Sequence, residues 1–517
     1  MTNFDAFSQA DIARLRESLL AADYEIDAVM EAVGPSGQAG LARNHTIAAS
    51  HVLGDRSDPL ARLIRLFVLQ QPQPRARIAE IVDLPALLEA GLLEEARAED
   101  PSQSHRGAGS LALSTDPTDD LVRATIDIRP YSDDGEGVSG WAVSDHVAAL
   151  DTAAIQFDPN HVLGISAASI SLAHLTSRRP VVRALDLGTG CGIQCLHLAG
   201  HSEKIVATDL NPRALAMARL TCGLNGIDVE RRLGSLFDPV EGESFDLIVT
   251  NPPFVISPPR ADRLIYRESS QQGDDLMRQV VNQGSERLSP GGTLVVVGNW
   301  AHTAGQTWQE RVDGWVPAGY DVIAIERELL DVYEYAEVWL ADAGWSGTPH
   351  YRRRYEEWLR YFDQLGIESV GLGWILVQRN ERREPGRRHL PWAHPVDRPA
   401  DELMACFDAI GPSRWSDEEL LARHWILAAD TVQETLGPPG GADPAHVVLR
   451  RQHGLKRAIE VGTALGGVLG ACDGELALRQ IIDAVASLTD VDAHALRGEI
   501  LLDVRSLIAD TWLSEAR

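Results

Sequence analysis

Lysine, cysteine and long apolar runs are all scarce in this sequence. Lys204 and Lys456 are its lysines, and arginine supplies the rest of the 47 basic residues. The five cysteines form no CxxC pair, so we expect reduced thiols and no metal site. No apolar run reaches the roughly 20 residues that a membrane-spanning helix needs, so we expect no membrane partner. The first residues also lack the basic and apolar regions of a signal peptide, which predicts a cytoplasmic location.

Basic charge is in deficit as well. The 47 Lys and Arg residues face 75 Asp and Glu residues, for a net charge of −28. A protein that binds the phosphate backbone of a nucleic acid non-specifically usually has a basic surface. The acidic net charge therefore argues against a nucleic-acid partner of this kind. The remaining composition, 44% hydrophobic and 24% charged, is typical of a globular protein.

The length of 517 residues is too great for one core and predicts two or three domains. Residues 1–150 are predicted to form helices followed by short strands, a winged-helix-like outline. A helix is expected from the cap Ser8 to about Met30, with Gly34-Pro35 as its stop, and strands over 111–115, 122–130 and 138–144. Residues 381–517 are predicted to be a mainly helical module. Arg379 to Arg388, with five arginines, is interpreted as a linker or an exposed basic patch.

Strands and helices alternate over residues 151–380, which predicts an α/β fold with a doubly wound sheet. The expected strands include a third strand before Leu233 and the segments Val181–Leu187, Ile205–Asp209, Asp246–Thr250, Thr293–Gly298, Tyr320–Arg327 and Val370–Gln378. A helical insertion is expected at about 350–364, between the last two strands.

A glycine-rich turn follows the first of these strands, at Asp186-Leu187-Gly188-Thr189-Gly190-Cys191-Gly192. Glycine is needed where φ is positive or where a ligand approaches the backbone. The helix that follows offers unpaired N–H groups and a partial positive charge, which suit a carboxylate. The spacing is GxGxG, not the GxGxxG of dinucleotide-binding folds. A tight turn without a ligand remains the alternative.

Two further loops lie at the carboxyl ends of the next strands. Asp209 stands about 20 residues after the glycine turn, where a carboxylate can accept the ribose hydroxyls of an adenosine. The alternative is a helix-capping acid before Pro212. Ser235 and Leu236 follow the third strand and are predicted to flank an adenine ring, or to form a loop without ligand contact.

The strongest motif is Asn251-Pro252-Pro253-Phe254, directly after the strand Asp246–Thr250. Two prolines cannot continue a central strand, so the chain leaves the sheet here, at the edge where ligands bind in this fold class. The Asn251 side-chain oxygen and the Pro252 carbonyl can accept hydrogen bonds from an NH₂ group, and Phe254 can stack on a planar amide or base. Such acceptors orient a poorly nucleophilic nitrogen for attack.

These elements, in this order, resemble class I S-adenosylmethionine (SAM)-dependent methyltransferases of the "small domain" group, over roughly residues 155–340. That group includes HemK/PrmC-like protein-glutamine methyltransferases and RsmC-like ribosomal RNA guanine-N2 methyltransferases. The resemblance implies a Rossmann-like, seven-stranded sheet and SAM as cofactor. It implies a catalytic tetrad at Asn251, Pro252, Pro253 and Phe254, and cofactor contacts at Asp186, Gly188, Thr189, Gly190, Gly192, Asp209, Leu210, Ser235 and Leu236.

Two more segments resemble the HemK-like enzymes. Phe157–Gly164 stands where those enzymes keep a substrate loop, and Tyr266-Arg267-Glu268, followed by Gly273–Leu276, resembles the segment after their tetrad. HemK-like enzymes usually end the tetrad in Tyr, whereas guanine-N2 enzymes more often have Phe. The two end modules look closer to a multidomain family of uncharacterised bacterial methyltransferases.

The sequence therefore leaves several functions open. The first is methyl transfer to a protein glutamine side chain, which the acidic charge favours. The second is methylation of an exocyclic base amine of RNA or DNA, which Phe254 and the arginine runs Arg352–Arg354 and Arg379–Arg388 would support. A small-molecule methyltransferase and a non-catalytic SAM-binding protein are the remaining alternatives. A macromolecular acceptor, protein rather than nucleic acid, is the predicted partner.

Overall fold

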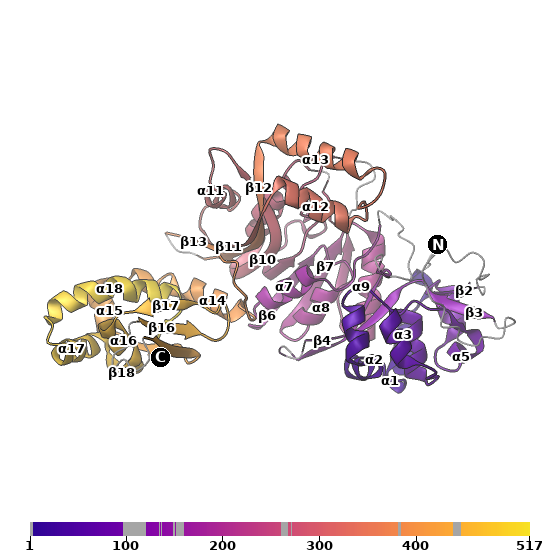
Figure 1. Cartoon of the computed structure of the whole chain (residues 1–517), viewed down its shortest axis with the longest axis horizontal. Helices are drawn as coiled ribbons and strands as arrows, with labels where there is room; N and C mark the ends of the chain where they lie inside the picture. Colours follow the sequence, from indigo (N-terminus) through magenta and orange to yellow (C-terminus); the bar gives the residue numbers. More distant parts are fainter. Residues whose placement is uncertain are drawn as a thin grey trace. The chain divides into compact units, whose positions relative to one another are not determined.

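The structure is a computed structural model of the whole chain, and its parts are drawn in Figure 1. It describes residues 4–96, 120–133, 135, 137–147, 150, 160–259, 267–269, 271–380, 384–437 and 446–516. The expected strand 111–115 and residues Phe157–Pro159 and Tyr266 lie outside these ranges. The chain divides into two compact units. The first holds 1–173, 178–317 and 329–379, and the second holds 174–177, 318–328 and 380–517.

The first unit begins with short helices whose starts are set by capping residues. Ser8 and Asp11 form a capping box for α1, and Asp58 caps α4 ahead of Pro59. The helical segments are η1 (Phe4–Ala6), α1 (Gln9–Ala21), α2 (Ile26–Leu41), α3 (Ile47–Leu53), α4 (Pro59–Leu63), η2 (Ile64–Val68), α5 (Arg75–Ala79) and α6 (Leu84–Glu89).

The single helix expected from Ser8 to Met30 is wrong. The chain breaks after Ala21, where Asp23 takes a φ of 55°, and a new helix starts at Ile26. Gly34-Pro35, expected to end the helix, instead kinks α2, because Gly34 has a φ of 61° inside it.

Short strands follow these helices. β1 (Gln73–Pro74), β3 (Leu121–Ala124) and β2 (Leu93–Ala96) form a three-stranded sheet, and β4 (Asp127–Asp133) pairs with β5 (Val138–Ser144) as a hairpin. The strand expected over 122–130 is thus two strands, separated at Thr125–Ile126. The winged-helix outline stays a prediction.

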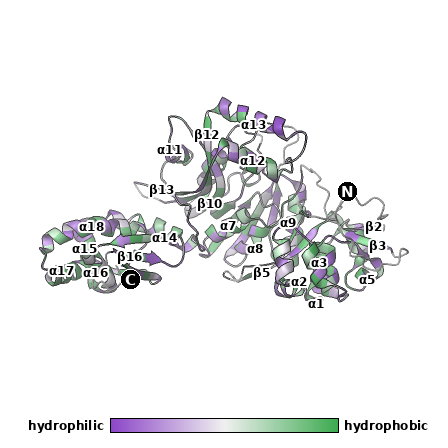
Figure 2. Cartoon of the chain, viewed as in Figure 1, coloured by the Kyte–Doolittle hydropathy of each residue, from purple (hydrophilic) through white to green (hydrophobic). Residues whose placement is uncertain are grey.

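All seven strands expected between residues 181 and 378 are present: β6 (Val181–Leu187), β7 (Ser202–Asp209), β8 (Glu230–Leu233), β9 (Phe245–Thr250), β10 (Leu288–Thr303), β11 (Tyr320–Asp331) and β12 (Ile367–Arg379). Within the first unit the order is β12-β10-β9-β6-β7-β8. The neighbouring strands β10, β9, β6, β7 and β8 run parallel to one another, and β12 runs antiparallel to β10. Residues 247–250 of β9 and 292–301 of β10 are buried, as expected for a sheet covered by helices, and Figure 2 colours the chain by hydropathy.

Helices connect the successive strands from β6 to β10: α8 (Ile193–Leu198), α9 (Pro212–Leu224), η3 (Asp238–Val240) and α10 (Asp275–Glu286). In addition, α7 (Ala167–Leu175) precedes β6 and α11 (Trp308–Asp313) follows β10. One apolar core runs from the N-terminal helices and the β4–β5 hairpin into α8 and α9. Asn225, at the end of α9, binds the backbone of Trp141 in β5 through both its amide atoms, at 3.0 and 2.7 Å. Residues before and after 150 therefore share a core, and the predicted three-domain division stays a prediction.

The helical insertion before β12 is present as α13 (Tyr351–Leu365), preceded by α12 (Val332–Asp342). Both helices pack in a separate apolar cluster with Val255 and Ile256, the residues just after the Asn-Pro-Pro-Phe tetrad. The Tyr335 hydroxyl of α12 accepts the Ile256 N–H at 2.9 Å. The insertion thus supports the segment that leaves β9.

The second unit is less helical than expected. Its helices are α14 (Ala400–Ala409), η4 (Pro412–Arg414), α15 (Asp417–Ala422), α16 (Thr463–Gly470), α17 (Leu478–Thr489) and α18 (Ala493–Ala509). Two three-stranded sheets accompany them: β18-β14-β19 and β15-β16-β17. Their strands are β14 (His424–Leu427), β15 (Thr431–Leu436), β16 (His446–Arg451), β17 (Ala458–Val461), β18 (Asp473–Ala477) and β19 (Leu513–Glu515). Most are four to six residues long, too short for alternation to reveal them.

The arginine run after β12 is only partly a linker. Arg387 and Arg388 open β13 (Arg387–Pro391), which pairs in parallel with β11, and Arg388 forms an ion pair with Asp510. In the ranges that the structure describes, no helix is long and apolar enough to cross a membrane.

Candidate functional site

A cavity of about 260 Å³ opens at the carboxyl ends of β6, β7 and β9 in the first unit. This is the edge of a parallel sheet where ligands are expected to bind. Eleven of the thirteen site residues predicted from the sequence line it: Asp186, Gly188, Thr189, Gly190, Asp209, Leu210, Ser235, Leu236, Asn251, Pro252 and Pro253. The fold therefore brings together motifs that span more than 60 residues of sequence.

The glycine turn connects β6 to α8. Gly188, Gly190 and Gly192 have φ values of 74°, 54° and 82°, a region that favours glycine. A Cβ on Gly188 or Gly190 would meet no atom within 4 Å, so both face open space. Gly192 does not line the cavity. A Cβ there would lie 3.0 Å from Ala218 Cα, so this glycine allows α8 and α9 to pack closely.

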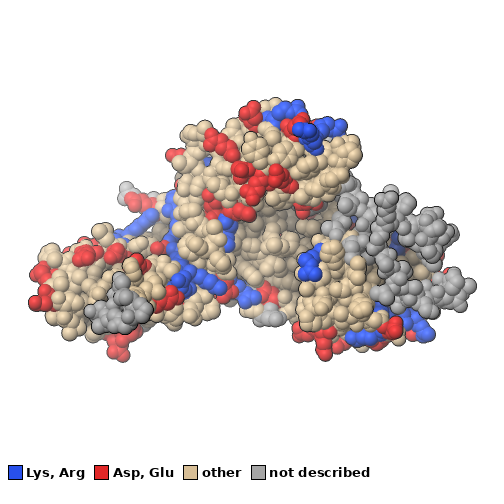
Figure 3. All heavy atoms as spheres, viewed as in Figure 1, with Lys and Arg blue, Asp and Glu red and all other residues tan. Residues whose placement is uncertain are grey.

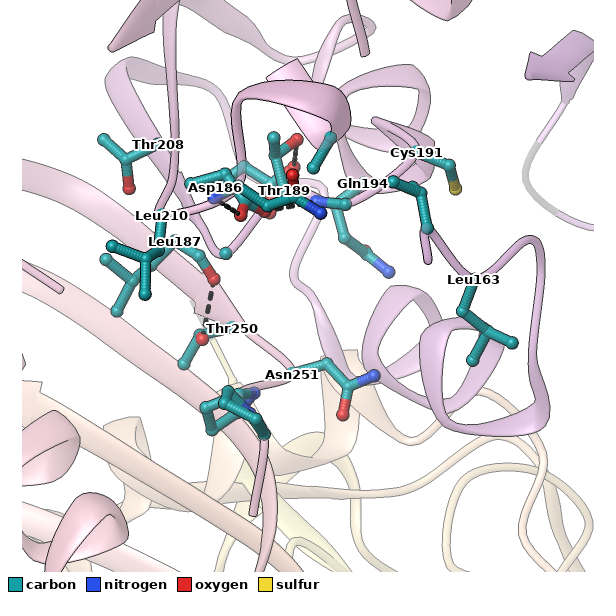
Figure 4. A pocket seen from close by; sticks show the side chains of 18 of the residues that line it. Leu163, Asp186, Leu187, Thr189, Cys191, Gln194, Thr208, Leu210, Thr250 and Asn251 are labelled. Atoms are coloured by element: carbon teal, nitrogen blue, oxygen red, sulfur yellow. Dashed lines mark hydrogen bonds between the residues drawn. The ribbon is translucent and has the colours of Figure 1, made fainter. Parts of the chain in front are cut away.

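Asp186, near the end of β6, fixes this turn through hydrogen bonds. Its carboxylate accepts the Thr189 hydroxyl at 2.6 Å and the Cys195 thiol at 3.4 Å, and the residue is 1% exposed. Burial raises the pKa of Asp186 to about 6, and the two hydrogen bonds oppose that rise. Figure 4 shows Asp186 and Thr189 together on one side of the cavity.

Asp209 ends β7 beside the turn. Its two oxygens accept the backbone N–H groups of Gly190, at 2.9 Å, and Asn211, at 2.8 Å. Burial raises its pKa above the usual value for Asp. A carboxylate has about four lone-pair sites, so each oxygen of Asp209 can accept one more hydrogen bond. The arrangement suits a ligand with two neighbouring hydroxyls.

Apolar contact beside Asp209 comes from two loops. Leu210 is 55% exposed and lines the cavity. Leu236, after β8, has a φ of 45°, and Ser235 precedes it on the same wall. These side chains, with the Asp209 carboxylate between their loops, could bind a flat heterocycle that carries a sugar.

The Asn-Pro-Pro segment forms the opposite part of the lining. Thr250, the last residue of β9, donates from its hydroxyl to the Leu187 carbonyl at 2.8 Å, which ties the end of β9 to the end of β6. The next side chain, Asn251, has a buried Oδ1 atom to which no described residue donates. Figure 4 shows Asn251 on the far side of Thr250 from Asp186. A buried acceptor without a donor is unfavourable by about 1–3 kcal/mol, so this atom is suited to a ligand N–H.

Phe254 lies apart from this arrangement. It is not among the described residues that line the cavity, and its ring contacts Trp339 edge-to-face, with ring centroids 6.0 Å apart. It packs on the same apolar cluster as α12 and α13. The stacking role expected for Phe254 stays a prediction.

Several lining residues lie outside the motifs predicted from the sequence. Ser166, Ser169 and Gln194 flank the glycine turn in the sequence, and Ser269 and Gln271 follow the tetrad. Gln194 donates to the Ser169 carbonyl at 2.7 Å. They carry no motif of their own, because their position depends on how α7 and the segment after β9 fold back over the sheet.

Glu268 and Gln271 add acceptors to the cavity lining. Glu268 is 8% exposed, and its Oε1 pairs with Arg267 at 2.8 Å. Arg267 in turn binds the Trp339 carbonyl and Asp342 on α12. Gln271 Oε1 is buried and has no donor among the described residues. Over those residues, no group of three or more His, Cys, Asp and Glu side chains could hold a metal ion.

Comparisons with known proteins match two parts of the chain. Residues 166–314 match the family model "Methyltransferase small domain", and residues 21–103 match "Domain of unknown function (DUF7059)". The first match contains the glycine turn, Asp209 and the tetrad.

Curated relatives align with the same region. A release factor glutamine methyltransferase of Deinococcus radiodurans is 37% identical over 126 residues, which cover 22% of this chain and 44% of that protein. A ribosomal protein uL3 glutamine methyltransferase of Bradyrhizobium diazoefficiens is 32% identical over 148 residues, 26% of this chain and 46% of that protein. A ribosomal RNA small subunit methyltransferase C of Alcanivorax borkumensis is 28% identical over 117 residues, 23% and 32% respectively. The chain thus spans less than half the length of each relative.

Proposed function

We propose that this chain is a SAM-dependent N-methyltransferase. The proposal starts from the match of residues 166–314 to the methyltransferase small domain. Its acceptor would be a planar amide or amine nitrogen on a macromolecule. The observation that carries the proposal is the buried, unpartnered Asn251 Oδ1 in the same cavity as the glycine turn and Asp209.

The residues of the glycine-turn end fit SAM. Gly188 and Gly190 leave the backbone open to a ligand, and the turn lies at the start of α8, where a carboxylate is stabilised. Asp209 would accept the ribose hydroxyls, and Leu210, Ser235 and Leu236 would contact the adenine ring. When bound, SAM supplies a methyl group on an electrophilic sulfonium.

The residues of the tetrad end fit an NH₂ group. Asn251 Oδ1 would accept one N–H and the Pro252 carbonyl the other, which fixes the orientation of the nitrogen. An amide nitrogen is a weak nucleophile because its lone pair is delocalised, and two fixed acceptors favour a more tetrahedral nitrogen. The contribution of the protein is thus positioning and electrostatic stabilisation.

A protein glutamine side chain is the acceptor that we propose first. The net charge of −28 opposes a polyanion. Figure 3 shows basic side chains gathered over α13, but Arg352 and Arg353 there lie 3.4 and 3.9 Å from Glu356 and Glu357, which lowers the local positive charge. Arg354 stacks on Trp345, 3.5 Å from its ring centroid. The run Arg352–Arg354 is therefore a weaker phosphate-binding surface than three unpaired arginines would be.

An exocyclic base amine is the second candidate, and Glu268 favours it. A carboxylate in the same cavity as Asn251 suits an edge with adjacent N–H donors, as on guanine, better than a side-chain amide with one NH₂. Glu268 and Gln271 both line the cavity.

The test is transfer of a labelled methyl group. The purified chain and its Asn251→Ala variant are incubated with labelled SAM and with lysate from a strain that lacks the protein, and portions are digested with protease or RNase. Label that depends on Asn251 and is lost to protease supports a protein acceptor. Label lost to RNase supports the base amine instead. No Asn251-dependent label in any fraction contradicts the proposed activity.

A further inference from the structure

One wall of the cavity lies outside the segments that the methyltransferase resemblance assigns to SAM binding. Residues His161, Val162, Leu163 and Gly164 line it, ahead of α7. This segment has no helix or strand conformation of its own. An irregular segment keeps one conformation only if other parts of the chain hold it, because its backbone has many alternatives. The residues that hydrogen-bond to this segment therefore help to set the shape of the cavity.

Asp145, the first residue after β5, holds the segment from the N-terminal side. Its backbone N–H donates to the Val162 carbonyl at 3.1 Å, and its carboxylate accepts the Val162 N–H at 2.7 Å. The same carboxylate binds Arg213, whose Nε lies 3.1 Å from both oxygens. The Asp145 side chain is 12% exposed, so water competes little with these bonds. Asp145 thus joins the cavity wall to the first turn of α9.

Asn211 joins the same wall to the ribose-binding side. Its Nδ2 donates to the Asn160 carbonyl at 2.8 Å, directly before the segment. Its backbone N–H donates to Asp209 Oδ1 at 2.8 Å, and its Oδ1 caps α9 by accepting the Arg213 N–H at 3.0 Å. One residue therefore contacts the wall, the proposed ribose acid and the helix that carries Arg213.

From these contacts we infer that Asp145 and Asn211 are positioning residues for the cofactor: they hold His161–Gly164 against bound SAM. The chain before the methyltransferase small domain then completes the SAM site, because Asp145 follows a hairpin that shares its core with the N-terminal helices. The inference rests on SAM binding in the proposed function. It does not depend on the identity of the methyl acceptor.

The expected effect is on affinity. If the segment is in its binding conformation for a smaller fraction of the time, the apparent Kd for SAM rises by the same factor. We expect about a tenfold higher Kd for Asp145→Ala and for Asn211→Ser. Serine at position 211 keeps an oxygen that can cap α9 but is too short to reach Asn160. Asp145→Asn keeps an acceptor for Val162 and should recover part of the affinity.

The experiment is calorimetric titration of the full chain with SAM, together with hydrogen exchange of the peptide that covers residues 160–164. The matched control is Glu243→Ala, which removes a carboxylate that pairs with Arg183 and Arg232, none of them among the described residues that line the cavity. The inference predicts weaker SAM binding and faster hydrogen exchange in Asp145→Ala and Asn211→Ser. SAM affinity should recover in part in Asp145→Asn and stay within twofold of wild type in Glu243→Ala.

Two results would overturn it. A folded Asp145→Ala protein with wild-type affinity for SAM would show that the wall needs no such support. An equal loss of affinity in Glu243→Ala would show a general effect of destabilisation. Failure of the proposed function is distinguishable, because the wild-type chain itself would then not bind SAM.

Discussion

The two ends of the cavity differ in how their polar atoms are used. At the glycine-turn end, the carboxylates of Asp186 and Asp209 already accept hydrogen bonds from Thr189, Cys195, Gly190 and Asn211. At the tetrad end, Asn251 Oδ1 and Gln271 Oε1 are buried without a donor among the described residues. Among the described residues, Thr208 Oγ1 is the one buried lining atom at the glycine-turn end that also has no hydrogen-bond partner.

The difference separates structure that exists before a ligand binds from structure that a ligand completes. The carboxylates of the glycine-turn end fix their own loops, so this end is preorganised. The amide oxygens of the tetrad end are unsatisfied until an N–H donor arrives, which is unfavourable by about 1–3 kcal/mol for each atom. Substitutions at the two ends should therefore affect different steps.

The largest effect is expected for Asn251→Ala. The turnover rate should fall at least about 100-fold, the scale seen when one preorganised hydrogen-bonding group is removed from an active site. SAM affinity should stay within a few-fold of wild type, because Asn251 lies away from the glycine turn. Turnover is measured as labelled methyl transfer and affinity by calorimetry. The control is Asn282→Ala, an asparagine on α10 that binds the Trp315 carbonyl outside the cavity. Loss of SAM binding in Asn251→Ala would make this residue structural.

Asp209→Ala should have the opposite effect. We expect SAM binding to weaken by about 1.5–3 kcal/mol, the scale of hydrogen bonds to a charged group. The matched control is Asp246→Ala, because Asp246 also accepts two backbone N–H groups, from Val182 at 3.1 Å and Arg183 at 2.9 Å, at the other edge of the sheet. Equal affinities in the wild type and Asp209→Ala would rule out the ribose role.

Gly188→Ala tests whether the turn faces the ligand. Gly188 and Gly291 have φ values of 74° and 80°, and a Cβ on either meets no atom within 4 Å. Alanine should thus cost each variant a similar strain, about 1 kcal/mol of stability. Only Gly188→Ala should also weaken SAM binding, because only Gly188 lines the cavity. Equal SAM affinities in the two variants, measured by calorimetry, would contradict this.

The last prediction concerns pH. The pKa of Asp186 rises from 3.8 to about 6 because of burial, so its ionisation is less favourable in the folded chain than in the unfolded one. Its contribution to stability is present below about pH 4 and is lost as pH rises through about 6. The free energy of unfolding of the wild type should therefore fall relative to that of Asp186→Asn over this range, as measured by urea denaturation. A constant difference between the two proteins would show that burial does not shift Asp186.

Sequence alone predicted what depends on local chemistry. The positive-φ glycines, the acid at the end of β7 and the double proline after β9 each have a backbone reason, and β6, β7 and β9, which carry them, are six to eight residues long. What it missed depends on contacts between distant segments. Gln271 and Gln194 reach the cavity only through folding of irregular segments and helices over the sheet. The break after Ala21 and the short strands of the second unit lack a periodic pattern. Phe254 packs on Trp339 of α12 and is not among the described residues that line the cavity, so its role in stacking stays a prediction.

A crystal structure of the complex with SAM would test the central claim most directly. The account predicts the ribose hydroxyls within hydrogen-bonding distance of Asp209, the carboxylate of the ligand at the glycine turn, and the sulfonium methyl directed toward Asn251, whose Oδ1 remains free for an acceptor. SAM bound with its adenosine against Asn251, or bound outside this cavity, would contradict the assignment of the two ends.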